Sequence, residues 1–136
     1  LKSSIARLYN VYGPYQIKKG KYSTIIGKWE KLFNNKKPLT IYGDGSKRRD
    51  FTHVNDIVEG LIKISINRKF GYVFELGRGK SHSISDVANM FGCEVEYLDD
   101  KLGETLNVLC DNEFTKEILD WEPKIDIQDY IKNIVK

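Results

Sequence analysis

Short strand-like segments alternate with segments of helical periodicity along the whole chain. Four apolar runs have the length and the bounding turn residues of strands: 4–9, 38–42, 72–76 and 94–98. A further stretch, 49–54, reads as extended. Apolar residues recur at helical spacing in five other segments: 22–35, 55–67, 83–91, 111–119 and a last one that begins at Asp126. This mixture predicts an α/β fold, and no repeat or linker divides the chain.

Turn and cap residues add local detail to this prediction. Gly43–Ser46 has the composition of a hairpin turn. Asn55 can cap the helix that follows it, because its side chain can accept a hydrogen bond from the first helical turn. The face of that helix that we expect to point inward carries Ile57, Val58, Leu61, Ile62 and Ser65.

The net charge of +3 conceals a strong asymmetry. Residues 1–69 contain 15 Lys and Arg against 5 Asp and Glu, whereas residues 70–136 contain 7 against 14. A basic half can attract a phosphate-bearing ligand, although a lysine-rich solvated face is the alternative. The aromatic residues form no recognised stacking platform, and helix-turn-helix and zinc spacings are missing, so we expect no nucleic-acid partner. No apolar run reaches the length of a membrane span, so we expect no membrane partner.

The two cysteines, Cys93 and Cys110, lack Cys-x-x-Cys spacing. Isolated cysteines of this kind indicate buried or idle thiols in a reducing compartment, and we therefore expect a cytoplasmic protein. The first residues also lack the pattern of a signal peptide. The two histidines, His53 and His82, do not stand at metal-ligand spacing, so we expect no metal site. We assign His53 to packing rather than to catalysis.

Two phrases near the start carry more specific information. Residues 7–14 read Arg-Leu-Tyr-Asn-Val-Tyr-Gly-Pro, and residues 41–56 contain Tyr-Gly-Asp-Gly followed by Arg-Asp-Phe-Thr-His-Val. Together they resemble the substrate-binding half of the extended short-chain dehydrogenase/reductase family, the NAD-dependent nucleotide-sugar epimerases and dehydratases. The resemblance implies the C-terminal part of a Rossmann-like fold, with a small mixed substrate-binding subdomain.

The sequence signatures of the other, N-terminal half of these enzymes are not evident. We find no Gly-x-x-Gly-x-x-Gly loop and assign no Tyr-x-x-x-Lys pair as catalytic. We therefore interpret residues 1–136 as the nucleotide-sugar-binding C-terminal part of such an enzyme, with the N-terminal dinucleotide-binding half absent. On this interpretation the chain has no catalytic residue of its own, and NAD is bound mainly by the missing half.

The side-chain chemistry of three residues makes them candidates for ligand binding, independently of the resemblance. The Arg49 guanidinium follows a glycine-rich turn and can bind a diphosphate through two parallel hydrogen bonds, or form an ion pair with Asp50 or Asp56. Asn10, at a strand end, can donate to phosphate or sugar hydroxyls, or bond its own backbone in a turn. Tyr42 can stack on a base or serve as an ordinary strand aromatic.

The resemblance favours the ligand-binding alternative for all three. It implies that Arg49 contacts the diphosphate of a nucleotide-sugar and that Asn10 lies against the substrate. It also implies that Tyr42 packs on the base, in a pocket that Thr40 lines.

The resemblance adds further residues in two other segments. Lys101 takes the place of an arginine that binds the diphosphate in relatives, and Glu104 that of an acid that binds ribose. Ser23 and Thr24 fall in the segment that closes over the nucleotide. Arg7 has a structural role on this interpretation, buried in its strand and anchoring a carboxylate.

An activity follows from the same resemblance. In the family, NAD takes a hydride from the sugar, while a Tyr removes the hydroxyl proton and a Lys lowers the pKa of that Tyr. We favour a UDP-sugar 4-epimerase that works through a 4-keto intermediate; a 4,6-dehydratase and a non-catalytic binding module are the alternatives. In relatives, strands 4–9 and 72–76 join the edge of the dinucleotide-binding sheet. We therefore expect exposed edges here, and a homodimer or a partner chain that carries the missing half.

Overall fold

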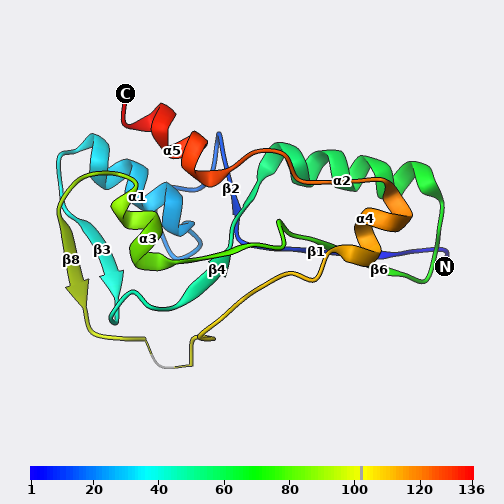
Figure 1. Cartoon of the computed structure of the whole chain (residues 1–136), viewed down its shortest axis with the longest axis horizontal. Helices are drawn as coiled ribbons and strands as arrows, with labels where there is room; N and C mark the ends of the chain where they lie inside the picture. The colour runs from blue at the N-terminus through cyan, green and yellow to red at the C-terminus, as the bar shows by residue number, and fades with distance from the viewer. Residues whose placement is uncertain (102) are drawn as a thin grey trace.

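The computed structural model describes residues 1–101 and 103–136. Strands and helices alternate along the chain, which confirms the predicted α/β class. The elements are β1 (Ile5–Leu8), β2 (Val11–Tyr12), α1 (Ile25–Asn34), β3 (Leu39–Tyr42), β4 (Arg48–Asp50), β5 (Thr52–His53), α2 (Val54–Asn67), β6 (Val73–Leu76), β7 (Ser81–Ser83), α3 (Ile84–Asn89), β8 (Val95–Leu98), α4 (Glu113–Leu119) and α5 (Ile127–Ile134). Figure 1 shows two lobes along the long axis, one around β1 and β6 and the other around β3 and β8.

The first lobe is built on a pair of parallel strands. β1 and β6 run side by side, with Ile5 opposite Val73 and Leu8 opposite Leu76. The helices α2 and α4 both pack against β6 (Figure 1). A Cβ atom at Gly60 would lie only 2.6 Å from a methyl group of Leu76, so glycine lets α2 approach β6 closely. The buried core of this lobe consists of Ile57, Phe74, Leu76, Leu119 and Trp121.

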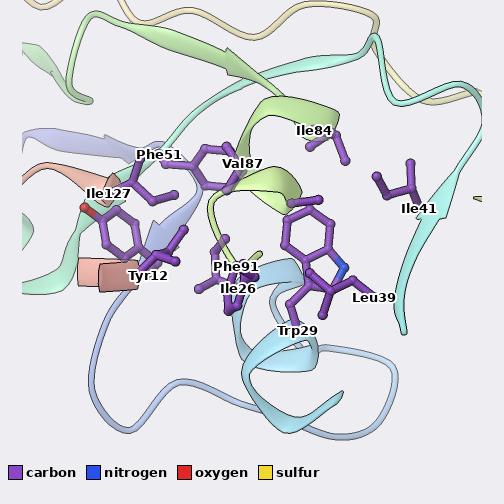
Figure 2. Packing of buried hydrophobic residues seen from close by; sticks show 12 residues of the cluster. Tyr12, Ile26, Trp29, Leu39, Ile41, Phe51, Ile84, Val87, Phe91 and Ile127 are labelled. Atoms are coloured by element: carbon purple, nitrogen blue, oxygen red, sulfur yellow. The ribbon is translucent and has the colours of Figure 1, made fainter. Parts of the chain in front are cut away.

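The second lobe holds the larger core. β3 and β8 are parallel, with Leu39 opposite Val95 and Tyr42 opposite Leu98. The helices α1 and α3 pack against β3. Figure 2 shows how the apolar side chains of these helices meet those of β3. The apolar stripe of α5 is also directed inward through Ile127 and Ile131, as its periodicity predicts.

Two short strand pairs lie outside these lobe sheets. β2 pairs with β5 in parallel, and β4 pairs with β7 in antiparallel orientation. The predicted hairpin at Gly43–Ser46 is therefore wrong, because β3 and β4 pair with other strands and not with each other. The segment is still a turn: Asp44 Oδ1 accepts hydrogen bonds from the amide and the hydroxyl of Ser46. The Gly45 carbonyl also accepts a hydrogen bond from the Ser85 amide, which ties the turn to α3.

The start and the inward face of α2 differ from the prediction. The cap is His53, whose Nδ1 accepts a hydrogen bond from the Asn55 amide, and the helix begins at Val54. Ile57 and Gly60 are buried, with Ile64 packed against the core. The closest approach to β6 occurs at a glycine, which periodicity in apolar residues does not detect. The side chains expected inside that are instead exposed are Val58, Leu61, Ile62 and Ser65.

Apolar side chains also remain exposed on the strand pair of the first lobe. Ile5 and Leu8 are about half exposed, at 59% and 48%. Within the described parts of the chain, β1 pairs with β6 alone. The edge and the apolar surface expected from the sequence are therefore present. No helix in residues 1–101 or 103–136 is long and apolar enough to cross a membrane.

Burial determines the state of the thiols and of His53. Burial raises the pKa of the Cys110 thiol to about 12, and it also raises the pKa of Cys93, so both stay protonated at neutral pH. His53 is buried, and its ring makes edge contacts with the rings of Tyr12 and Tyr130. Burial lowers the pKa of His53 below its ordinary value. These environments agree with idle thiols and a packing histidine.

Candidate functional site

A cleft of about 580 Å³ lies in the second lobe, where α1, β3 and β4 face the segment after β8. Its volume falls within the range of about 300–1,000 Å³ that is usual for small-molecule sites. The floor contains Trp29, which is buried and donates a hydrogen bond from Nε1 to the Thr40 carbonyl. The remaining walls carry polar and charged side chains around this apolar floor.

All eight residues that the sequence analysis assigns to binding line this one cleft. They are Asn10, Ser23, Thr24, Thr40, Tyr42, Arg49, Lys101 and Glu104. They come from segments that are far apart in the sequence, so only the fold brings them together. That they bind a ligand remains a prediction.

Arg49 faces the cleft because of strand alternation. Successive side chains of a strand point to opposite faces, so Arg49 turns outward and Asp50 turns into the core. The Asp50 carboxylate accepts hydrogen bonds from the amides of Arg78, Gly79 and Cys110. The alternative of an Arg49–Asp50 ion pair is therefore excluded. Asp56 is excluded as well, since it is buried and accepts a hydrogen bond from the Ile125 amide.

The Arg49 guanidinium is oriented by backbone carbonyls. Its Nη1 donates to the carbonyl oxygens of Arg48 and Thr105, at 2.8 and 2.7 Å. Its Nη2 lies 3.6 Å from Glu104 Oε2. Neutral carbonyls fix the plane of the guanidinium without cancelling its charge. The group is thus positioned in advance to bind an anion.

Asn10 lies in a turn, but its side chain bonds to another segment and not to its own backbone. Its backbone has a φ of +29°, which is the conformation of a turn after β1. Its Nδ2 donates to the Asp50 carbonyl at 3.2 Å, and the side chain lines the cleft. The turn presents the carboxamide at the cleft wall, beside the strand that carries Arg49.

An aromatic ring and a cation occupy the opposite wall. Tyr42 is 37% exposed at the end of β3. The Lys101 Nζ lies 3.7 Å from the centroid of the Tyr42 ring, which is a cation–π contact. The backbone amide of Lys101 donates to Asp100 Oδ1 at 2.7 Å.

The hydroxyls of Ser23 and Thr24 already have partners within the chain. Thr24 caps α1: its Oγ1 accepts a hydrogen bond from the Gly27 amide and donates to Gln16 Oε1. Ser23 donates to the Gly20 carbonyl at 2.6 Å. Both residues therefore shape the cleft wall, and a ligand would have to share their hydroxyls.

Lys47 and Lys28 also line the cleft, and the sequence analysis missed both. The Lys47 side chain is only 8% exposed and forms ion pairs with Asp100 and Glu104. The hydrogen bond with Lys47 lowers the pKa of Asp100, and Asp100 in turn raises the pKa of Lys47. Lys47 precedes β4 and lies outside it, so strand alternation does not predict its place in the cleft.

The charge of the lining is predominantly positive. The cations on it are Lys28, Lys47, Arg49 and Lys101, and Glu104 is the carboxylate among them. A cleft with several cations and low-dielectric walls concentrates anions from solution. The site is therefore suited to a ligand that combines a negative charge with a flat apolar group for Tyr42.

The environment of Arg7 differs in part from the prediction. It does anchor a carboxylate, since its Nη1 lies 2.9 Å from Glu75 Oε1. Its side chain, however, is 64% exposed and not buried. β1 has a neighbouring strand on one side only among the described residues, so the guanidinium reaches solvent.

The spacing Tyr-x-x-x-Lys does occur twice in the sequence, at Tyr15–Lys19 and Tyr97–Lys101. Neither pair lies on a helix, where residues four apart share a face. Tyr15 is fully exposed, and the Lys101 ammonium lies over Tyr42. The structure gives neither spacing the arrangement of a tyrosine activated by a lysine.

Comparison with protein-family models identifies the family of the chain. Residues 1–77, more than half of the sequence, match the model described as the NAD dependent epimerase/dehydratase family. The chain belongs to this family.

Individual members of the family match almost the whole chain. The UDP-glucuronate 4-epimerase of Thermodesulfobacterium geofontis is 32% identical, over 99% of this chain and 42% of its own length. The UDP-glucose 4-epimerase of Thermotoga maritima, solved with UDP-glucose, has a TM-score of 0.89 at 26% identity, over 99% of this chain and 45% of that chain. The UDP-glucuronic acid 4-epimerase of Bacillus cereus, solved with UDP-glucuronic acid and NAD, has a TM-score of 0.85 at 27% identity, over 95% and 42%. The chain thus spans less than half the length of these relatives.

The family name implies NAD, but the turns at Gly77–Gly79 and Gly43–Ser46 do not fit a dinucleotide. Such sites offer free backbone amides at the start of a helix. The amides of Arg78 and Gly79 are taken by the Asp50 carboxylate. The turn at Gly43–Ser46 is tied to α3 through Ser85 and opens no helix of its own. We therefore assign no NAD-dependent step to residues of this chain.

Proposed function

We propose that the chain binds the nucleoside diphosphate part of a nucleotide-sugar, and that it forms the C-terminal part of an NAD-dependent 4-epimerase. The observation that supports this proposal is the convergence of Tyr42 with four cations in one cleft. A nucleoside diphosphate needs an aromatic surface for its base and cations for its phosphates. UDP is the base and phosphate portion of the ligands named for the three relatives described above, so we propose a UDP-sugar.

The geometry suggests a role for each wall of the cleft. Arg49, whose Nη1 is held by two carbonyls and whose Nη2 lies near Glu104, offers Nε to the diphosphate, and Lys101 supplies a second cation. Tyr42 stacks on the uracil, while Glu104 accepts from the ribose. Asn10 donates to the phosphate or the sugar. Binding energy of this kind, remote from the reacting carbon, orients the sugar for chemistry elsewhere.

The reacting groups belong to a separate half in this proposal. Bound NAD would supply hydride acceptance and return at the sugar ring. The dinucleotide-binding half, on the same polypeptide or on a partner chain, would hold it together with the catalytic groups. We also propose a cytoplasmic location, because both cysteines are free thiols.

Replacing Arg49 by alanine should weaken UDP binding by about tenfold to a hundredfold, since hydrogen bonds to a charged group contribute about 1.5–3 kcal/mol. Calorimetric titration of the chain with UDP, GDP and dTDP measures this effect and identifies the preferred base. We expect UDP to bind more tightly than the other two nucleotides.

The matched control is Arg48→Ala. It removes the same charge from the neighbouring position, where the side chain bonds to Ser81 on β7. UDP affinity should change little in this variant. Equal losses in the two variants would contradict a specific role for Arg49. Failure of the unaltered chain to bind any of the three nucleotides would contradict the proposal that this chain carries the nucleotide site.

We also expect the isolated chain to associate with itself in solution. The exposed apolar residues on β1 and α2 would be covered by the dinucleotide-binding half in the whole enzyme, and without it they bring two copies together. Sedimentation velocity at increasing protein concentration should therefore show a rising proportion of dimer. Val58→Lys combined with Ile62→Lys, which places two like charges on this surface, should restore a monomer.

Leu106→Lys serves as the control for this experiment. Leu106 is 73% exposed and lies outside β1 and α2, so the dimer should persist in this variant. An unaltered chain that remained monomeric and melted in one sharp transition would show that the apolar surface needs no partner.

A further inference from the structure

The contact between Lys101 and Tyr42 has a consequence for ligand choice. At 3.7 Å from the ring centroid, the Lys101 ammonium occupies one face of the Tyr42 ring. Both side chains line the cleft. A base stacked on that face would require the same space. The ring and the ammonium are thus partners in the free chain, and a base has to displace the lysine.

The other charged groups nearby are already paired. Asp100 and Glu104 form ion pairs with Lys47, and Glu104 also approaches Arg49. Within residues 1–101 and 103–136, no carboxylate lies within 4.0 Å of the Lys101 ammonium. The Tyr42 ring is therefore the contact that holds the Lys101 ammonium in the free chain.

Lys101 can contact either the Tyr42 ring or a phosphate of the ligand, and these two contacts differ in strength. A cation–π contact at an exposed site changes an equilibrium constant by roughly two- to fivefold. A charge-assisted hydrogen bond to phosphate is worth about tenfold or more. A ligand with both a base and a phosphate can therefore displace Lys101 and give it a better partner. A nucleoside displaces Lys101 and offers it no charged partner in return.

We propose that Lys101 makes the cleft selective for phosphorylated nucleotides over nucleosides, because it covers the stacking face of Tyr42 until a phosphate draws it away. This inference rests on the proposed function and specifies how the same site selects its ligand. Lys101 suits the task because its ammonium is carried on a flexible four-carbon stem. Arg49, held by two carbonyls, is the stationary cation beside it.

The test is to measure uridine and UDP binding to the ¹⁵N-labelled chain by NMR titration, with and without Lys101→Ala. We expect the variant to bind uridine about two- to fivefold more tightly, because the ring face is open. It should bind UDP at least about two- to fivefold more weakly, because the lost phosphate contact, about tenfold or more, outweighs the gain from the open ring face. Opposite signs for the two ligands are the signature of the proposal, since damage to the fold would weaken both.

Two further variants sharpen the comparison. Lys101→Met keeps a long chain that can still cover Tyr42, so UDP affinity should fall while uridine affinity stays unchanged. Lys37→Ala removes a lysine that lies outside the cleft and should alter neither affinity. In the unaltered chain, the ring current of Tyr42 should shift the ε-methylene protons of Lys101 upfield. Addition of UDP should abolish this shift.

Four outcomes would overturn the inference. Weaker binding of both ligands by Lys101→Ala, or unchanged uridine affinity, would show that Lys101 and the base do not compete. Lys101 protons without an upfield shift would show that the ring is open in the free chain. Absence of UDP binding to the unaltered chain would overturn the proposed function itself, and with it this inference.

Discussion

Replacing Asp50 by alanine should lower the free energy of unfolding by at least about 3 kcal/mol, because three N–H groups lose a charged acceptor and a hydrogen bond to a charged group contributes about 1.5–3 kcal/mol. Asp50 has no exposed surface, and its carboxylate accepts from the amides of Arg78, Gly79 and Cys110. It thereby joins β4 to the turn after β6 and to the segment before α4. Urea unfolding followed by circular dichroism gives the measurement.

Two variants show whether the lost acceptors are the cause. Asp50→Asn keeps the shape but directs an NH₂ group toward at least one amide donor, so an intermediate loss is expected. Asp44→Ala removes a carboxylate from the same segment, where Asp44 is exposed and bonds only to Ser46. That loss should stay below about 1 kcal/mol, as is usual for surface positions. Equal effects of Asp50→Ala and Asp44→Ala would refute the anchoring role of Asp50.

The second large loss of stability is expected on substitution of Trp29. Truncation of a buried Trp to alanine costs about 3–5 kcal/mol, and Trp29 is only 1% exposed. Its ring packs edge-on against Phe91, at 6.1 Å between centroids, and its Nε1 donates to the Thr40 carbonyl. Trp29→Ala should therefore destabilise the second lobe. It should also weaken UDP binding, because the cleft loses its floor and β3 loses a contact beside Tyr42.

Trp29→Phe separates the two contributions of this residue. It retains most of the apolar volume and loses the hydrogen bond to Thr40, so a smaller loss of about 1–2 kcal/mol is expected. Tyr22→Ala, at an aromatic residue that is 79% exposed just before α1, should leave the unfolding midpoint nearly unchanged. A stability of Trp29→Ala close to that of the unaltered chain would show that the cleft floor contributes little to the fold.

The eight residues predicted from local phrases and from the family resemblance line one cleft. Arg49 after a glycine-rich turn and Tyr42 before it are readable in this way. Lys28 and Lys47 are not, because a lysine in a basic segment is usually a solvated residue. Their place at the cleft depends on the orientation of α1 and β4. Binding itself remains to be tested for every residue of the cleft.

The partners of the strands could not be predicted from the sequence. Gly43–Ser46 has the composition of a hairpin turn, yet β3 pairs with β8 and β4 pairs with β7. Turn composition reports only the local change of direction of the chain. The choice of partner depends on segments about 30 to 55 residues later in the sequence, through packing that local propensity does not contain.

For α2 as well, the sequence predicts the element but not how it packs. Apolar periodicity in 55–67 correctly indicates a helix, but it places Val58 and Leu61 inside. The structure instead turns Gly60 toward β6, since the small residue permits the closest approach to Leu76. Two apolar faces exist on this helix, and the sequence does not show which of them the rest of the chain covers.

The sequence by itself determined the α/β class, the family resemblance and the eight residues of the candidate site. These depend on periodicity and on short motifs, which are properties of neighbouring residues. The tertiary structure alone decided that Asp50 is an anchor while Arg49 faces the cleft, that Lys47 pairs with Asp100 and Glu104, and that Lys101 covers Tyr42. Each of these facts joins residues from distant segments. Such contacts exist only after the chain has folded, because burial and the pairing of charges depend on segments that are distant in the sequence.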